Sequence, residues 1–200
     1  MIKLILILTI SLFSLNSFSK TKILFLGDSL TEGYGIAKEK AYPSIVKRNL
    51  KDNENIEIDI INGSVSGSTT ASATSRLKWF LRANPSILVL ALGANDGLRG
   101  INLDSSKANL SKTITLAKKK GLKVVLAGMY IPPNYGVDYT LKFKKMYQEL
   151  HKKFNVVLIP FLLEGVAANS KLNQSDGIHP NELGHELMAK NILKYLRPLL

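Results

Sequence analysis

Residues 24–33 read LFLGDSLTEG, an apolar run that leads directly into a tight turn and then toward a helix. A serine in such a turn projects its hydroxyl above the sheet, while its backbone N–H lies near a helix N-terminus. Ser29 is therefore a candidate oxygen nucleophile whose own N–H also helps to hold an oxyanion. The alternative is a plain helix cap, because Asp28 and Ser29 are both residue types that favour the N-cap position.

The same strand-to-helix order repeats along the whole chain. Most of the apolar runs are continuous rather than alternating, which favours parallel strands covered by helices on both faces. Five strand–helix pairs in succession predict an α/β fold, a three-layer α/β/α sandwich around a five-stranded parallel sheet. The predicted strands lie at residues 22–26, 56–61, 87–92, 124–127 and 156–159, and the predicted helices at residues 41–51, 72–81, 105–120, 139–153 and 181–196.

The composition fits one globular domain. The chain has 200 residues, 46% of them hydrophobic, so it can bury one sizeable core but is short for two. Charged residues make up 21%, which is ordinary globular usage and excludes a disordered class. The chain contains no cysteine, which excludes a disulfide scaffold, a Cys-ligated zinc site, an iron–sulfur cluster and a thiol nucleophile.

Residues 1–19 have the pattern of a secretory signal peptide. Lys3 supplies a positive charge, residues 4–15 are almost continuously apolar, and small residues precede a cleavage point near Ser19. The apolar run is well short of the roughly 20 residues that a spanning helix needs. The sequence therefore predicts an exported protein, periplasmic or secreted, with one domain at residues 20–200. A short membrane anchor or a buried first helix is the alternative.

The formal net charge of +12 is strongly positive, and cleavage of the signal peptide removes only the charge of Lys3. The lysines are dispersed over predicted helices, as at residues 118–120 and 152–153. One interpretation is solvated helix faces; the other is a peripheral contact with an anionic membrane. We expect no binding to nucleic acid in an exported chain.

The chain has three histidines, and only His179 stands in a pattern that suits a general base. Asp176 precedes it by three residues, a spacing that lets the carboxylate fold back on the imidazole Nδ1–H while Nε2 takes a proton from Ser29. The alternative is an Asp-Gly turn before the last helix. His151 lies in a lysine-rich helix. His185 is followed by Ala189 where a second zinc ligand would stand, so we expect no metal site.

Two other loops offer donors for an oxyanion. Gly67 lies in a loop of small residues with free N–H groups, and Asn95 follows a strongly apolar strand. The Asn95 amide can donate to a developing oxyanion together with the N–H groups of Ser29 and Gly67. A flexible connection and an Asn-Asp turn are the corresponding structural alternatives.

Together these segments resemble the SGNH or GDSL hydrolase superfamily, and within it the bacterial periplasmic enzymes of the thioesterase, lysophospholipase and arylesterase group. The resemblance covers nearly all of the chain after residue 19 and implies a flavodoxin-like sheet and no cofactor. It also implies that Ser29 is the nucleophile, His179 the base and Asp176 its orienting carboxylate. The matching blocks are Gly27-Asp28-Ser29-Leu30, Gly67, Gly93-x-Asn95-Asp96 and Asp176-x-x-His179, with Ser68 as a departure outside the catalytic set.

The resulting hypothesis is a monomeric serine hydrolase that cleaves acyl esters and thioesters of small molecules or lipids through an acyl-enzyme. One alternative is an acetylesterase acting on carbohydrate or an envelope polymer. A flavodoxin-like module that binds a small anion without chemistry is the alternative outside enzymes. An apolar acyl chain would lie against Leu98, Ile131, Pro132 and Tyr135, with Ile101, Tyr130 and Pro133 nearby, unless these side chains serve core packing.

Overall fold

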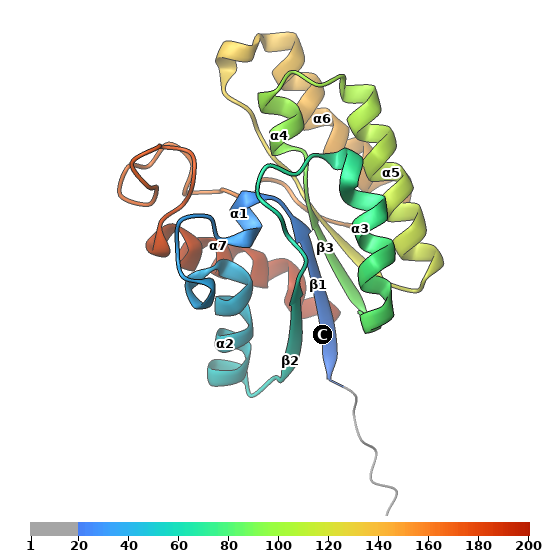
Figure 1. Cartoon of the computed structure of the whole chain (residues 1–200), viewed down its shortest axis with the longest axis vertical. Helices are drawn as coiled ribbons and strands as arrows, with labels where there is room; N and C mark the ends of the chain where they lie inside the picture. Colours follow the sequence, from blue (N-terminus) through green and yellow to red (C-terminus); the bar gives the residue numbers. More distant parts are fainter. Residues whose placement is uncertain (1–19) are drawn as a thin grey trace, which may run out of the picture.

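The computed structural model describes residues 20–200, which form a three-layer α/β/α sandwich (Figure 1). The predicted signal peptide, residues 1–19, lies outside the described residues. Five parallel strands pair in the order β2-β1-β3-β4-β5, which is the flavodoxin-like order, so the predicted fold class is confirmed. The strands are β1 (Thr21–Gly27), β2 (Ile58–Asn62), β3 (Ile87–Ala91), β4 (Lys123–Ala127) and β5 (Val157–Ile159).

Helices cover both faces of the sheet (Figure 1). Helices α2 (Tyr42–Glu54) and α7 (Glu182–Leu196) pack together on one face, and α3 (Ala73–Phe80), α5 (Leu103–Lys119) and α6 (Val137–Phe154) cover the other. Two short helices, α1 (Ser29–Glu32) and α4 (Ala94–Leu98), follow β1 and β3 directly. Single 3-10 turns lie at Lys38–Lys40, Thr70–Ser72, Leu81–Ala83, Pro133–Tyr135 and Arg197–Leu199.

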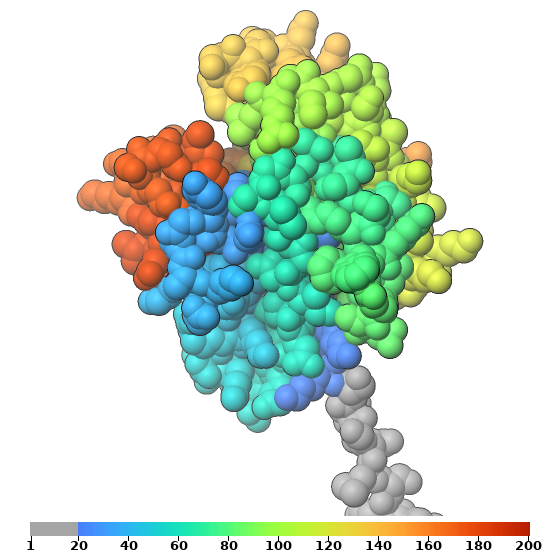
Figure 2. Space-filling model, viewed as in Figure 1, coloured from blue at the N-terminus to red at the C-terminus, as the bar shows by residue number. Residues whose placement is uncertain are grey.

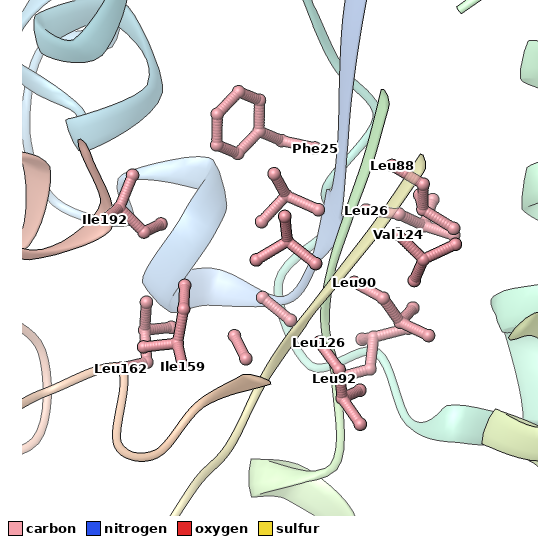
Figure 3. Close-up of a cluster of buried hydrophobic side chains, with 14 of the residues drawn as sticks. Phe25, Leu26, Leu88, Leu90, Leu92, Val124, Leu126, Ile159, Leu162 and Ile192 are labelled. Carbon is pink, nitrogen blue, oxygen red and sulfur yellow. The ribbon is translucent and has the colours of Figure 1, made fainter. Parts of the chain in front are cut away.

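The core explains why the strand sequences are continuously apolar. All five residues of β3 are buried, because helices pack on both sides of this central strand. Figure 3 shows Phe25 and Ile192 on the side of α2 and α7, and Leu88 and Leu90 on the opposite side of the sheet. Burial of one such side chain contributes about 1.5–3 kcal/mol. The sheet is therefore a rigid platform for the loops at its carboxyl edge.

The structure departs from the predicted elements mainly at their ends and at α4. Residues 94–98, expected as a loop, form α4 because Gly93 adopts φ +123° and lets the chain turn from β3 directly into a helix. A Cβ atom at Gly93 would lie 2.2 Å from Tyr147 Oη, so this position also needs the absence of a side chain. Within residues 20–200, no helix has the length and apolar character required to cross a membrane.

Candidate active site

Ser29 is the first residue of α1, at the carboxyl end of β1. Asp28 is the N-cap of this helix: its Oδ1 accepts a hydrogen bond from the N–H of Leu30 at 3.1 Å. The turn is tight, because a Cβ atom at Gly27 would lie 2.3 Å from Thr31 Oγ1. Asp28 therefore provides the cap, and the hydroxyl of Ser29 is left free for another partner.

That partner is His179, which is 150 residues further along the chain. His179 Nε2 lies 3.0 Å from Ser29 Oγ, and His179 Nδ1 lies 2.7 Å from Asp176 Oδ2. The other oxygen of Asp176 accepts the backbone N–H groups of Ile178 at 2.8 Å and His179 at 2.9 Å. The structure thus brings Ser29, His179 and Asp176 into one hydrogen-bonded chain.

These hydrogen bonds also determine the charge of Asp176. Hydrogen bonds lower the pKa of Asp176 to about 2. The backbone N–H of His179 has the largest effect, followed by the His179 imidazole and then the N–H of Ile178. The carboxylate is therefore ionised at neutral pH. An ionised carboxylate keeps the proton of neutral His179 on Nδ1, which leaves Nε2 as an acceptor for the Ser29 hydroxyl proton.

The loop that carries His179 is braced against the segment after Ser29. Gln174 Nε2 donates to the carbonyl of Tyr34 at 2.7 Å and to that of Pro180 at 3.0 Å. The ring of Tyr34 lies 4.7 Å from the imidazole of His179, centroid to centroid. Figure 2 shows the orange-red segment that includes His179 lying beside the blue segment that follows Ser29. This bracing fixes the imidazole relative to α1.

Hydrogen bonds connect the predicted oxyanion donor Asn95 to the turn at Gly67 and to the start of α1. Gly67 has φ +74° in a turn closed by a hydrogen bond from Ser68 N–H to the carbonyl of Val65. Asn95 Nδ2 donates to the carbonyl of Ser68 at 3.1 Å and lies 3.5 Å from Asp28 Oδ2. Within residues 20–200, the N–H groups of Ser29 and Gly67 make no hydrogen bond. The Asn95 amide therefore links the turn at Gly67 and Ser68 to Asp28, the residue before Ser29.

The structure separates the predicted acyl contacts into two groups. Leu98 and Tyr135 are 39% and 37% exposed, and Tyr135 Oη donates to the carbonyl of Leu98. Pro132 is also exposed. Ile131 is only 8% exposed and faces Gly97 of α4, so it serves core packing, and its predicted place among the acyl contacts is corrected. The sequence pattern did not show this, because an apolar loop residue can face either way.

The remaining two histidines make hydrogen bonds to groups other than Ser29. His185 is buried in α7, and its Nδ1 accepts the N–H of Tyr42 at 3.2 Å. His151 is partly buried, with Nδ1 2.5 Å from the carbonyl oxygen of Val156. The described part of the chain contains no group of three or more His, Asp or Glu side chains that could hold a metal ion.

Three polar residues close to Ser29 in the chain or in contact with its turn have environments or contacts that the sequence did not show. The carboxyl of Asp28 is 2% exposed, and burial raises its pKa to about 6. Glu32 accepts hydrogen bonds from the N–H and the hydroxyl of Ser66. Arg76 of α3 donates to the carbonyls of Gly27 and Gly63. The signals in the sequence were the place of Asp28 directly before Ser29 and the place of Glu32 three residues after it.

A parallel α/β sandwich with a serine, a histidine and an aspartate in one hydrogen-bonded chain at the carboxyl edge of its sheet defines a serine hydrolase. The chain belongs to the GDSL-like Lipase/Acylhydrolase family, whose model matches residues 25–187. It is accordingly a hydrolase of acyl esters, and the family predicted from the sequence motifs is confirmed.

Known proteins support this assignment over nearly the full chain. The arylesterase of Vibrio mimicus is 37% identical over 201 residues, covering 98% of this chain and 100% of the relative. Thioesterase 1/protease 1/lysophospholipase L1 of Escherichia coli K12 is 34% identical, covering 88% of this chain and 84% of the relative. The crystal structure of the psychrotrophic esterase EstA from Pseudoalteromonas sp., inhibited by monoethylphosphonate, has a TM-score of 0.84 and 31% identity, covering 90% of this chain and 98% of that one.

Proposed function

We propose that this hydrolase cleaves acyl esters and thioesters through an acyl-enzyme formed on Ser29. The observation that carries the proposal is the continuous chain of hydrogen bonds from Ser29 Oγ through His179 to Asp176. A binding module for a small anion has no need of this arrangement, since it would use the free N–H groups alone. A paired serine and histidine, with the histidine oriented by a third group, is the signature of nucleophilic catalysis.

The proposed reaction uses the site residues as follows. His179 Nε2 takes the hydroxyl proton as Ser29 Oγ attacks the acyl carbonyl, and Asp176 stabilises the imidazolium that forms. The N–H groups of Ser29 and Gly67 and the Asn95 amide hold the negative carbonyl oxygen. The alcohol or thiol then leaves with the proton from Nε2. Water repeats the sequence on the acyl-enzyme, which releases the acid and restores Ser29.

Labelling with a fluorophosphonate tests this proposal directly. The probe phosphonylates an activated serine, so the wild-type chain should be modified at Ser29 in a peptide map. Ser29→Ala should abolish both labelling and turnover while the thermal unfolding midpoint stays close to that of the wild type. Ser44→Ala, at an exposed hydroxyl bonded to the carbonyl of Lys38, is the matched control and should keep full labelling. Normal turnover by folded Ser29→Ala would refute the proposal.

We further propose that the acyl group is an apolar chain rather than acetyl. Leu98 at the end of α4 and Tyr135 in the 3-10 turn before α6 expose apolar surface. The names of two relatives include arylesterase and lysophospholipase. Each buried methylene would contribute about 0.8 kcal/mol to binding. kcat/KM should therefore rise from acetyl to octanoyl esters, and long-chain acyl-CoA should be accepted. A panel in which acetyl esters are best and activity ends beyond butyryl would favour the acetylesterase alternative.

We propose that the protein is exported, with residues 1–19 removed near Ser19, and acts as a monomer that contacts anionic membranes peripherally. The positive, apolar and small-residue pattern of residues 1–19 supports export, and the net charge of +12 supports the membrane contact. Mass spectrometry of the protein recovered from the periplasm or medium should find a new N-terminus close to residue 20. An intact Met1 in that material would contradict the proposal.

A further inference from the structure

The turn that presents the Gly67 N–H is tied to the helix that begins with Ser29. Glu32 Oε2 accepts the backbone N–H of Ser66 at 2.7 Å, and the same oxygen accepts the Ser66 hydroxyl. Ser66 directly precedes Gly67 in the chain. The turn is otherwise open to solvent, since Val65 is 53% exposed. The Glu32 carboxylate therefore ties the exposed part of this turn to α1.

The position of the Glu32 carboxylate depends directly on the position of Ser29. The two residues are the last and the first of α1, so a single rigid turn of helix connects them. Deeper in the molecule, the ends of β1 and β2 are already joined. Gly27 N–H donates to Ser64 Oγ at 3.0 Å, Val65 N–H donates to the Gly27 carbonyl at 3.2 Å, and Arg76 spans both strand ends.

These hydrogen bonds between the strand ends reach no further than Val65 and do not hold Gly67. Past Val65, the described contacts that hold the turn are its own closing bond at Ser68, the Asn95 amide on the Ser68 carbonyl, the Arg99 guanidinium on the Gly67 carbonyl, and Glu32 on Ser66. Among these, Glu32 alone belongs to the helix that carries Ser29. An oxyanion hole needs its donors at a fixed distance from the attacking oxygen, so this link bears directly on the hole.

We propose that Glu32 is a positioning residue for the oxyanion hole, acting through Ser66 on the Gly67 N–H. The inference rests on the proposed role of Gly67 and Ser29 as donors. Glu32 does not touch the substrate in this scheme. It holds the Gly67 N–H, through Ser66, in a fixed position relative to the Ser29 N–H at the start of α1. Losing the tie should weaken transition-state binding without a comparable change in substrate binding.

Three variants and a control test the proposal with p-nitrophenyl butyrate as substrate. Glu32→Ala removes both hydrogen bonds and should lower kcat by roughly 10-fold to 100-fold, less than the loss of a whole donor, with KM within about threefold. Glu32→Gln keeps an oxygen that accepts the Ser66 N–H and should recover much of the loss. Ser66→Ala removes only the hydroxyl arm and should cost less than Glu32→Ala. Glu39→Ala, at another exposed carboxylate, should leave kcat unchanged.

Thermal unfolding and fluorophosphonate labelling separate the possible failures. Each assay is run below the unfolding midpoint of every variant, so a loss of kcat is not a loss of fold. Wild-type labelling at Ser29 with a Glu32→Ala kcat within twofold of wild type would overturn the positioning role alone. So would an effect confined to KM, or a loss in Glu32→Gln as large as in Glu32→Ala. Absence of labelling at Ser29 in the wild type would instead refute the proposed function.

Discussion

His179 and His185 are six residues apart in the sequence, yet they occupy opposite environments. The side chain of His179 is 20% exposed, and its two ring nitrogens face Ser29 Oγ and Asp176 Oδ2. His185 is 1% exposed in the contact between α2 and α7, where it accepts the N–H of Tyr42. Burial, and to a smaller extent the charge of His179, lowers the pKa of His185 to about 4.

Two aspartates show the same contrast. Asp176 has a 39% exposed side chain, and hydrogen bonds to its ionised form lower its pKa to about 2. Asp28 is 2% exposed, and burial raises its pKa to about 6. Partners and solvent access, rather than residue type, therefore decide which titratable group is available for proton transfer. Asp176 and His179 lie on the loop before α7. Their buried counterparts are Asp28, the N-cap of α1, and His185, which lies within α7.

The largest expected effect is a difference in kcat between variants of the two histidines. His179→Ala removes the proposed base and should lower kcat by roughly 10⁴- to 10⁶-fold, as expected when one member of a catalytic triad is lost. His185→Gln keeps an acceptor for the Tyr42 N–H and should retain kcat within about fivefold. Steady-state kinetics on octanoyl ester, with circular dichroism on both variants, measures this. Equal losses of kcat in two folded variants would show that the two histidines do not differ as described.

A second prediction concerns the carboxylate that orients His179. Asp176→Asn removes the negative charge and allows the imidazole to adopt the wrong tautomer, so kcat should fall by roughly 10²- to 10⁴-fold. The backbone N–H groups of Ile178 and His179 keep an oxygen partner, and the loop should keep its shape. The control is Glu182→Gln, which removes a nearby exposed carboxylate paired with Lys40. A variant as active as the wild type would show that Asp176 does not orient the base.

The third prediction tests whether Asn95 of α4 takes part in the reaction as an oxyanion donor. Asn95→Ala should lower kcat by roughly 10²- to 10³-fold with little change in KM, because the amide donates mainly to the transition state. Asn102→Ala, which removes the N-cap of α5, is a matched asparagine control and should affect stability rather than kcat. An effect of Asn95→Ala on KM alone would mean that this amide binds substrate instead.

The smallest expected effect is on stability: buried His185 should make the free energy of unfolding depend on pH. Unfolded histidine binds a proton below about pH 6.5, whereas folded His185 stays neutral down to about pH 4. The unfolded state therefore binds more protons in this window, and the free energy of unfolding falls as the pH falls through it, by up to about 3 kcal/mol from this group. Above pH 6.5 this contribution is absent, since His185 is neutral in both states.

Asp28 acts in the opposite direction. Its raised pKa of about 6 means that the folded state binds the extra proton between about pH 6 and its ordinary value, so acid stabilises the fold through this group. The informative measurement is therefore the difference between wild type and His185→Gln in urea unfolding from pH 7 to 4.5. The wild type should lose more stability over this range. Parallel profiles would show that His185 does not titrate between the two states as described.

Much of the architecture was predictable from the chain. The five apolar runs correspond to β1–β5, because strands buried on both faces must be continuously apolar. Polar residues directly after those runs fall at the carboxyl edge of the sheet, which is why Ser29, Gly67 and Asn95 were candidates before their geometry was known. The pair Asp176 and His179 was recognisable from spacing within one loop.

The sequence by itself determined the sheet and the family and made Ser29, Asp176 and His179 candidates, because apolar runs and ordered motifs can be read directly from the chain. The contact between Ser29 and His179, 150 residues apart, needed the tertiary structure. Only the tertiary structure decided that Ile131 packs in the core, that His185 is buried against Tyr42, and that Glu32 holds Ser66. Each of these depends on contacts between segments far apart in sequence or on which way a side chain faces. Such contacts exist only after the layers pack, since packing determines which polar groups lose water and which neighbours they meet.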